Sequence, residues 1–324
     1  MAVLPKQMVA FETSCPSGEA RGFDLDQADI GWIPEAKRRS CAPIRNSRER
    51  MNGRMLFLLC GAILAWIGEA RAQSGSPASR CQFEPVAEGM VASVADGRTI
   101  ALQDGREIRL DAIEIPLMPP PGQDQSMPAG HAARSALANL LTGKKVELRQ
   151  RVPGLTDRYG RFVAFVHAAG ASPGWTASHE MLAVGYARVA GRVGDRACAA
   201  ELRHHERTAR DSKLGLWGEA YYSIIRADSG AELLDGRGLF TLAEGKVLSV
   251  RESGGTIYVN FGRRGSQALT VTILKRHERI FVGAGVAPNR LENRHVRVRG
   301  WVEERNGPRI EATGPEQIEI LERN

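Results

Sequence analysis

Arginine and acidic side chains recur together in three short segments of this 324-residue sequence: Asp96–Arg98, Arg109–Glu114 and Asp157–Arg161. A guanidinium group stays charged at physiological pH, and its planar fork matches two oxygens of a phosphate. Cleavage of a phosphodiester also requires a group that orients a water molecule, and in many enzymes a metal ion held by carboxylates. These residue types therefore indicate chemistry at phosphate groups, either binding or hydrolysis.

The order of these segments is more specific than any one of them. Glu206, Ala209–Arg210 and Gly215–Trp217 follow further along the chain. In this order, residues 88–217 resemble the staphylococcal-nuclease (thermonuclease-like) domain. The resemblance implies a β-rich α+β fold, an OB-type five-stranded barrel with three helices packed against it.

The resemblance implies roles for four residues. Arg109 matches the family's first phosphate-binding arginine, and Arg161 matches its second. Arg158 and Tyr159 stand where the family has a Lys-Tyr pair beside a bound nucleotide. Phosphate or nucleic-acid binding by these four residues is therefore expected, and Arg109 and Arg161 would be catalytic if the domain is active. The alternative is that the arginines form salt bridges at the barrel rim.

Several positions that hold calcium or activate water in the family carry other residues here. Arg98 replaces a calcium ligand, and Glu114 is the one carboxylate that remains of the calcium site. Ile115 replaces a threonine, and Leu117 replaces the glutamate that orients the attacking water. Calcium takes roughly six to eight oxygen ligands, and a leucine can neither accept a proton nor position water. No calcium or other cofactor is therefore expected, and hydrolysis is predicted to be lost or strongly reduced.

Arg98 permits two interpretations. A guanidinium group at the calcium position could neutralise Glu114 and leave Arg109 and Arg161 facing an anion, which would make a metal-free site for phosphate or nucleic acid. Alternatively, Arg98 and Glu114 form an internal salt bridge and no ligand binds. Both interpretations remain open at the level of the sequence.

Hydrophobic periodicity predicts the elements that would position these residues. Residues 88–115 alternate apolar and polar side chains, as strands do, with a two-residue hairpin turn at Asp104–Gly105. Further on, apolar residues at helical spacing predict helices, the first of which ends at Gly143. The predicted elements after residue 115 are a loop at 116–128, helices at 129–142, 177–189 and 196–213, and strands at 145–151 and 161–167.

A second small β-domain is predicted over residues 240–322. Its element order, three strands, a short helix and a two-stranded return, is that of an OB fold. The alternative is a β-rich extension docked on the first barrel. Residues 218–239 show no strong period and are interpreted as a linker. The predicted elements are strands at 246–251, 256–261, 268–274, 295–305 and 308–313, and a helix at 275–282.

The strand at 295–305 combines basic and aromatic residues. Such a face could follow a nucleic-acid backbone, whereas the nearby acidic residues favour a balanced, solvated face. The basic residues are Arg294, His295, Arg297 and Arg299 near Trp301, and the acidic residues are Glu303, Glu304 and Glu311.

The first 72 residues do not resemble part of the fold. Residues 1–50 show no sustained period and are interpreted as disordered or as a wrongly assigned start. Residues 51–72 have a basic start, an apolar run and Ala70–Ala72, which is the layout of a signal peptide. The apolar run is shorter than the roughly 20 residues of a spanning helix, so export is expected, without stable membrane insertion after cleavage. Residues 73–87 are a flexible lead-in.

Export determines how the cysteines are interpreted. Cys81 and Cys198 are the two cysteines beyond the predicted signal peptide. An even pair in an oxidising compartment predicts a disulfide, and two buried free thiols are the alternative.

Three functions are compatible with these features. The first is an exported protein that binds phosphodiester or nucleic acid through its arginines, as a pseudoenzyme. The second is an active nuclease that uses a different metal or base, and the third is an envelope module that binds an unknown protein partner. The net charge of +7 favours approach to a polyanion without requiring one.

Overall fold

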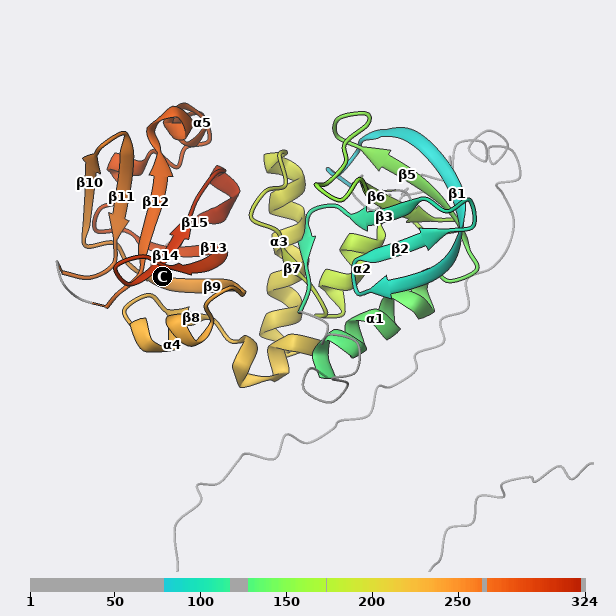
Figure 1. Cartoon of the computed structure of the whole chain (residues 1–324), viewed down its shortest axis with the longest axis horizontal. Coiled ribbons are helices and arrows are strands. Elements are labelled where there is room, and N and C mark those ends of the chain that lie inside the picture. Colours follow the sequence, from blue (N-terminus) through green and yellow to red (C-terminus); the bar gives the residue numbers. More distant parts are fainter. Residues whose placement is uncertain (1–78, 117–127, 173, 264–266, 322–324) are drawn as a thin grey trace, which may run out of the picture. The chain divides into compact units, whose positions relative to one another are not determined.

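The computed structural model describes residues 79–116, 128–172, 174–263 and 267–321 (Figure 1). These residues belong to one compact unit, Ala72–Asn324. The predicted N-terminal extension (1–50) and signal peptide (51–72) lie outside the described residues, as do residues 73–78 of the lead-in and Leu117. Among the described residues, no helix combines the length and the apolar character needed to cross a membrane.

The first part of the unit is a closed five-stranded barrel with the order β1-β2-β3-β6-β5, which confirms the predicted architecture. Strands β3 and β6 pair in parallel and the other neighbours are antiparallel. The first strand begins at Glu84, within the predicted lead-in. The strands are β1 (Glu84–Asp96), β2 (Thr99–Leu102), β3 (Glu107–Leu110), β5 (Lys145–Gln150) and β6 (Phe162–Ala168).

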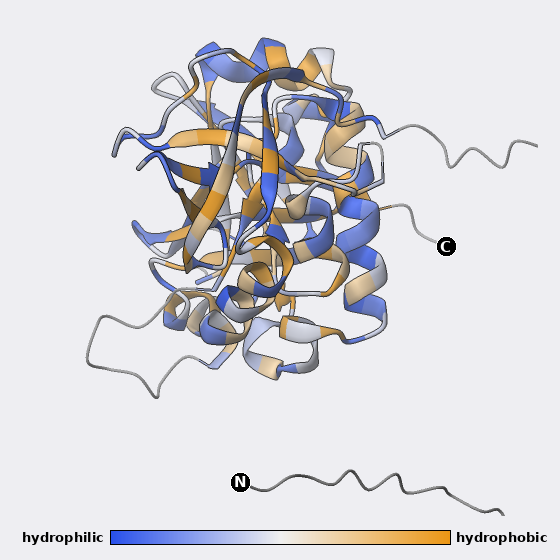
Figure 2. Cartoon of the chain, turned by 90° about the vertical axis from the view of Figure 1, so that its right-hand side faces the viewer, coloured by the Kyte–Doolittle hydropathy of each residue, from blue (hydrophilic) through white to orange (hydrophobic). Residues whose placement is uncertain are grey.

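Alternation of apolar residues explains why these segments close into a barrel. In β3, Ile108 and Leu110 are buried, whereas Arg109 between them remains partly exposed. Strand side chains point alternately to opposite faces, so one face of each strand fills the interior while the other can carry charges. Figure 2 shows hydrophobic and hydrophilic residues alternating along the strands.

The turn between β2 and β3 is longer than the sequence predicts. The backbone N–H of Leu102 donates to Arg106 O (2.9 Å), and that of Gly105 donates to Leu102 O (3.1 Å). The loop therefore has three residues, and the prediction of a two-residue turn at Asp104–Gly105 was wrong. Gly105 has a φ of 86°, the left-handed conformation that the last residue of a three-residue hairpin loop adopts.

Three helices pack on the barrel: α1 (Pro128–Leu141), α2 (Ala177–Ala183) and α3 (Arg196–Asp211). Helix α2 is shorter than the predicted 177–189, because Gly185 follows it with a φ of 80° and any side chain there would lie 2.3 Å from the Leu214 carbonyl oxygen. The chain then forms a strand, β7 (Arg188–Val189), which pairs with β4 (Ile113–Glu114).

A disulfide joins Cys81, before β1, to Cys198 in the first turn of α3. Both residues are fully buried. The predicted disulfide is therefore confirmed, and it ties the start of the barrel to its last helix.

His179 is a buried residue in the first turn of α2 and takes part in capping the N-terminus of that helix. Its ring Nδ1 lies 2.8 Å from Thr176 Oγ1 and its Nε2 lies 3.2 Å from a Glu201 carboxylate oxygen. The side chain is 0% exposed. Burial lowers the pKa of His179 to about 4; the Glu201 carboxylate raises the pKa again in part, and His205 lowers it.

This burial predicts a loss of stability in mild acid. Between pH 6.5, the ordinary pKa, and pH 4, the pKa in the fold, the unfolded chain takes up a proton that the folded chain does not. The free energy of unfolding should therefore fall through this range, by roughly 3 kcal/mol from this residue. Urea unfolding at both ends of the range should show a smaller pH effect in His179→Gln. The exposed control His204→Gln should retain the full effect, and equal slopes in all three proteins would contradict the assignment.

The second β-region is a mixed sheet with the order β10-β11-β12-β14-β13-β9-β8. Strands β12 and β14 pair in parallel, and β9 and β10 are consecutive along the chain. The predicted second β-domain is therefore present as a mixed sheet, and its strand order matches that of an OB fold only when β9 and β10 are counted as one bent strand. The strands are β9 (Phe240–Lys246), β10 (Ser249–Ser253), β11 (Thr256–Asn260), β12 (Thr270–Leu274), β13 (His295–Glu304), β14 (Pro308–Glu311) and β15 (Ile318–Leu321), with α5 (Glu278–Gly283) between β12 and β13.

The predicted linker, residues 218–239, contains secondary structure. Strand β8 (Ile225–Arg226) pairs in parallel with β9, and α4 (Gly230–Asp235) follows it. Leu233 of α4 is fully buried. These elements are too short to produce a period in the sequence, and their packing decides their structure.

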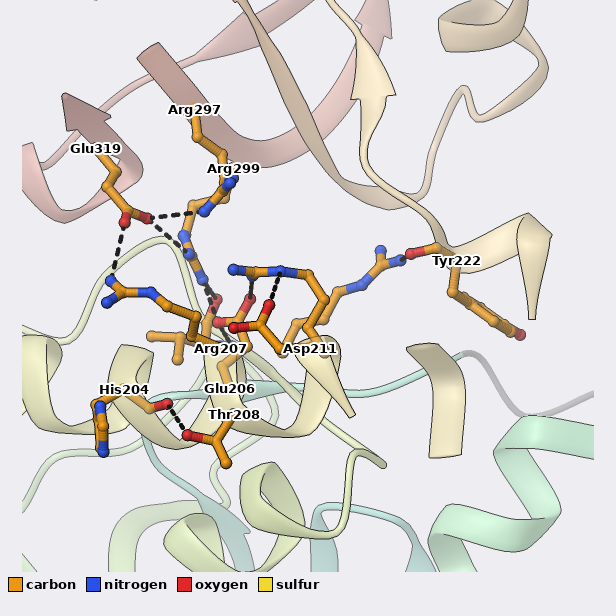
Figure 3. Close-up of polar contacts among 12 residues, drawn as sticks. His204, Glu206, Arg207, Thr208, Asp211, Tyr222, Arg297, Arg299 and Glu319 are labelled. Atoms are coloured by element: carbon orange, nitrogen blue, oxygen red, sulfur yellow. Dashed lines mark hydrogen bonds and ion pairs between the residues drawn. The ribbon is translucent and has the colours of Figure 1, made fainter. Parts of the chain in front are cut away.

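A buried ion pair connects α3 with β13 (Figure 3). Arg299 Nη1 donates to Glu206 Oε2 (2.6 Å) and to the Val189 carbonyl oxygen (3.1 Å). The two charged side chains are only 2% and 1% exposed. Arg297 on the same strand face pairs with Glu244 (2.8 Å). This face is therefore neither of the two surfaces considered from the sequence, because α3 and β7 cover Arg299.

Candidate functional site

Arg98 lies in the turn between β1 and β2, and the acidic residue before it shapes that turn. Asp96 accepts hydrogen bonds from the Arg98 backbone N–H (2.8 Å) and from Thr99 Oγ1 (3.1 Å). The Arg98 carbonyl oxygen accepts from the Leu110 N–H of β3 (2.7 Å). Arg98 is therefore fixed beside the end of the strand that carries Arg109.

A sharp corner after β3 brings Glu114 back toward Arg109. Ala112 has a φ of 66°, which is uncommon for a residue with a side chain. Its N–H donates to Asp111 Oδ1 and its carbonyl oxygen accepts from Ala190, both at 2.8 Å. Burial raises the pKa of Asp111, and Arg151 opposes that effect. Asp111 thus stabilises the corner, and its carboxylate is held by Arg151 at 3.2 Å.

The Glu114 carboxylate accepts hydrogen bonds from two arginines. Its Oε2 accepts from Arg98 Nη1, and its Oε1 accepts from Arg109 Nη2 at 3.0 Å. The Glu114 side chain is 10% exposed, against 19% for Arg98 and 25% for Arg109. The Arg98–Glu114 contact, which both interpretations of the sequence include, is therefore present, and Arg109 joins it.

The pKa values of these arginines reflect burial and mutual repulsion. Burial lowers the pKa of Arg98 to about 10, with a further lowering from the neighbouring charges of Arg109 and Arg161. The pKa of Arg109 is also lowered, mainly by burial. Arg98 and Arg109 both remain protonated at neutral pH, so together with Arg161 they hold three positive charges close together.

Arg161 is positioned by the loop between β5 and β6. Asp157 accepts from the backbone N–H groups of Tyr159 (2.9 Å) and Arg161 (3.1 Å), and from Arg161 Nε (2.8 Å). Burial raises the pKa of Asp157, but these hydrogen bonds outweigh it and the net shift is downward. Arg161 is thus held in a salt bridge with Asp157 of its own loop. Salt bridges of this kind were the alternative to phosphate binding in the sequence analysis.

Arg158 and Tyr159 form the exposed edge of this group. The Tyr159 side chain is 66% exposed. The guanidinium carbons of Arg158 and Arg161 lie 4.7 and 5.2 Å from the centre of its ring. Within the described residues, Arg158 has no carboxylate within salt-bridge distance. Its charge is therefore available to a ligand at the surface.

The residues present do not fit a calcium ion at Glu114. Both carboxylate oxygens already accept from guanidinium groups, so a divalent cation would have to displace Arg98 and Arg109. The Ile115 side chain offers no ligand atom, and Leu117 lies outside the described residues. Across the described ranges, one group of three potential metal ligands lies close together, namely Cys81, His179 and Glu201. The sulfur of Cys81 is bonded to Cys198 in the disulfide, so it is not a free thiolate ligand.

Two cavities border Glu114, and both reach residues of the second β-region. The first has a volume of about 400 Å³ and includes Arg109, Glu114, Phe240 and Trp301. The second has a volume of about 480 Å³ and shares Glu114, Phe240 and Trp301 with the first. Phe240 was not singled out in the sequence, because nothing local to β9 connects it with residues of the first barrel.

Comparison with known proteins agrees with this geometry. The model of the staphylococcal nuclease homologue family matches residues 107–219, a range that includes Arg109, Glu114 and Arg161 but begins after Arg98. A search of the curated proteins found no match. The match, the closed five-stranded barrel and the clustered arginines agree, and residues 107–219 therefore form a staphylococcal nuclease homologue domain.

Proposed function

We propose that this protein binds phosphodiester groups of nucleic acid through Arg98, Arg109 and Arg161, and that its calcium-dependent hydrolysis is lost or strongly reduced. The observation that carries the proposal is the way in which Glu114 holds two arginines. Each guanidinium group has five N–H donors, and Arg98 and Arg109 each give Glu114 a single hydrogen bond. Most donors therefore remain for phosphate oxygens.

The hydrogen-bonding state of Arg109 supports an anionic ligand. Its Nε is buried and has no partner among the described residues. Buried polar groups are rarely left unsatisfied, and a phosphate oxygen is a suitable acceptor. Tyr159 and Arg158, at the exposed edge, extend the positive and aromatic surface along which a strand could continue.

The proposal of reduced hydrolysis rests on the groups available to activate water. Both carboxylate oxygens of Glu114 already accept hydrogen bonds from guanidinium groups, so an attacking water molecule would have to compete with them. Leu117 stands at the position of the water-orienting glutamate in the resemblance, and it carries no ionisable group.

Export is part of the proposal. The apolar run after Met55 and the Ala70–Ala72 segment have the layout of a signal peptide. The disulfide between Cys81 and Cys198 is compatible with an oxidising compartment. The protein would then meet nucleic acid outside the cytosol.

Arg109→Ala tests the proposal. Its affinity for a fluorescently labelled single-stranded oligonucleotide, measured by anisotropy in the presence of a chelator, should fall about tenfold, because a charge-assisted hydrogen-bonding group is lost. The salt dependence should also weaken by about one phosphate contact. The control is Arg226→Ala, since Arg226 is 78% exposed and paired with Asp228; its affinity should not change.

Two outcomes would contradict the proposal. Robust calcium-dependent cleavage that disappears in Arg109→Ala would identify an active nuclease. No binding of single-stranded or duplex nucleic acid by the unmodified protein would favour a protein-binding module.

A further inference from the structure

The second cavity beside Glu114 has an aromatic lining. Tyr221, Tyr222, Phe240 and Trp301 contribute to its wall, and its volume of about 480 Å³ lies in the range of small-molecule sites. We call it the aromatic cavity. None of these four side chains belongs to the barrel that carries the arginines.

Two aromatic side chains come from the second sheet. Phe240 of β9 and Trp301 of β13 are register partners, and their rings meet edge to face with centroids 5.9 Å apart. Trp301 lies two residues after Arg299, so both side chains point to the same face of β13. Arg299 is buried against Glu206, whereas Trp301 remains 42% exposed. Trp301 therefore keeps an accessible surface at the edge of the contact between sheet and barrel.

The other two aromatic side chains come from the short helical turn Ala220–Tyr222. Tyr221 is 68% exposed. The two tyrosine rings meet edge to face with centroids 5.0 Å apart. The cavity thus has exposed aromatic surface on two of its sides, on which a planar ligand could stack.

Arg188 joins the aromatic segments to the barrel. It is the register partner of Glu114, and its guanidinium group donates to the carbonyl oxygens of Phe240 and Tyr222, both at 2.6 Å. Its Nε has no hydrogen-bond partner among the described residues, and no carboxylate of those residues lies within salt-bridge distance. The residue is only 8% exposed and lines the cavity. A buried, incompletely satisfied cation is thus built into the wall.

The charges around the cavity indicate which part of a nucleotide fits it. Glu219, Glu232 and Asp235 also line it, and they would repel a phosphate. The same carboxylates can accept hydrogen bonds from N–H groups of a base. The phosphate would instead lie at Arg98 and Arg109, which pair with Glu114 and do not line this cavity. A planar base with polar edges matches aromatic faces and hydrogen-bonding groups together.

We propose that the aromatic cavity holds an unpaired base of a single-stranded nucleic acid whose phosphate lies at Arg98 and Arg109. This inference rests on the proposed function. A base inside a duplex is stacked and paired, so it cannot enter the cavity without being unstacked. The second β-region therefore supplies base contacts, and the first barrel supplies phosphate contacts.

The test compares two ligands of equal charge by calorimetry with the full protein: a thymidine oligomer, and an abasic deoxyribose-phosphate oligomer of the same length. Trp301→Leu and Tyr221→Ala should each weaken binding of the thymidine oligomer fivefold or more, the lower end of the contribution of one stacked base. Binding of the abasic oligomer should not change. Tyr258→Leu, on β11 and outside both cavities, is the matched control, and thermal unfolding of each variant verifies the fold.

The outcomes separate this inference from the proposed function. If Trp301→Leu and Tyr221→Ala bind the thymidine oligomer as tightly as the unmodified protein, the aromatic cavity is not a base site, although the arginines still bind phosphate. If the unmodified protein binds neither oligomer, the proposed function fails as well. If oligolysine binds in a Trp301-dependent manner and thymidine does not, the occupant is a cationic peptide and the inference is overturned.

Discussion

Reduction of the disulfide between Cys81 and Cys198 is expected to lower the free energy of unfolding by about 5 kcal/mol, according to the chain-entropy relation. The bond closes a loop of 117 positions, which is most of the first barrel and its helices. A covalent closure of that length removes many conformations from the unfolded chain while leaving the folded chain unchanged. This is the largest single effect on stability that we predict for the protein.

The measurement is urea unfolding with and without a thiol reductant. Because both cysteines are buried, reduction should be slow in the native state and fast once the chain unfolds. The control is the double variant Cys81→Ala with Cys198→Ala, whose unfolding midpoint should not respond to the reductant and should match that of the reduced protein. A midpoint that is unchanged by reduction in the original protein would show that the bond does not stabilise the fold.

Arg299→Met is expected to lower the free energy of unfolding by about 3–5 kcal/mol, the range for breaking a buried ion pair by removing one partner. Glu206 would then remain buried, at 1% exposure, without its main cationic partner. Arg210 lies 3.9 Å from the other carboxylate oxygen, too far for a hydrogen bond. The loss should be visible as a lower midpoint in urea.

Two further variants make the test specific. Arg237→Met removes a salt bridge to Glu304 in which the side chains are 63% and 49% exposed, and it should change stability by no more than about 1 kcal/mol. Combining Arg299→Met with Glu206→Gln should restore part of the loss, because the buried charge is gone and the amide can still accept from Val189 N–H. A cost as small as that of Arg237→Met would mean that solvent reaches the Glu206–Arg299 pair.

The same ion pair bears on ligand binding. Arg299 and Trp301 point to one face of β13, and the ion pair between Arg299 and Glu206 (Figure 3) attaches this strand to α3 two residues before Trp301. A variant that loosens this contact should therefore weaken base binding more than phosphate binding. The proposed base site would then depend on the same strand that carries the buried ion pair.

Local patterns in the sequence predicted most of the first barrel. The alternation around Ile108 and Leu110 and the helical spacing before Gly143 correspond to β3 and α1 in the structure. The errors lie where a local signal competes with packing. Gly185 ends α2 because the chain passes close to Leu214, and no periodicity within 177–189 reports that contact.

The sequence predicted which residues form the candidate site, but not all of the contacts between them. Arg98 was expected to neutralise Glu114, with or without an anion site at Arg109 and Arg161, and the structure contains the Arg98–Glu114 pair. That Arg109 shares the same carboxylate depends on the corner at Ala112, whose positive φ was not evident from the residue type.

By itself, the sequence determined the barrel, the disulfide partners and the set of arginines. The hydrophobic periodicity, the number of cysteines and the order of the motifs can each be read directly along the chain. Only the tertiary structure decided that Arg299 is buried, that Arg188 joins Phe240 and Tyr222 to the barrel, and that Trp301 lines a cavity beside Glu114. These contacts join residues far apart in the chain, as Glu206 and Arg299 are. Their formation depends on how two folded β-regions bury charge and aromatic surface against each other, which no local pattern encodes.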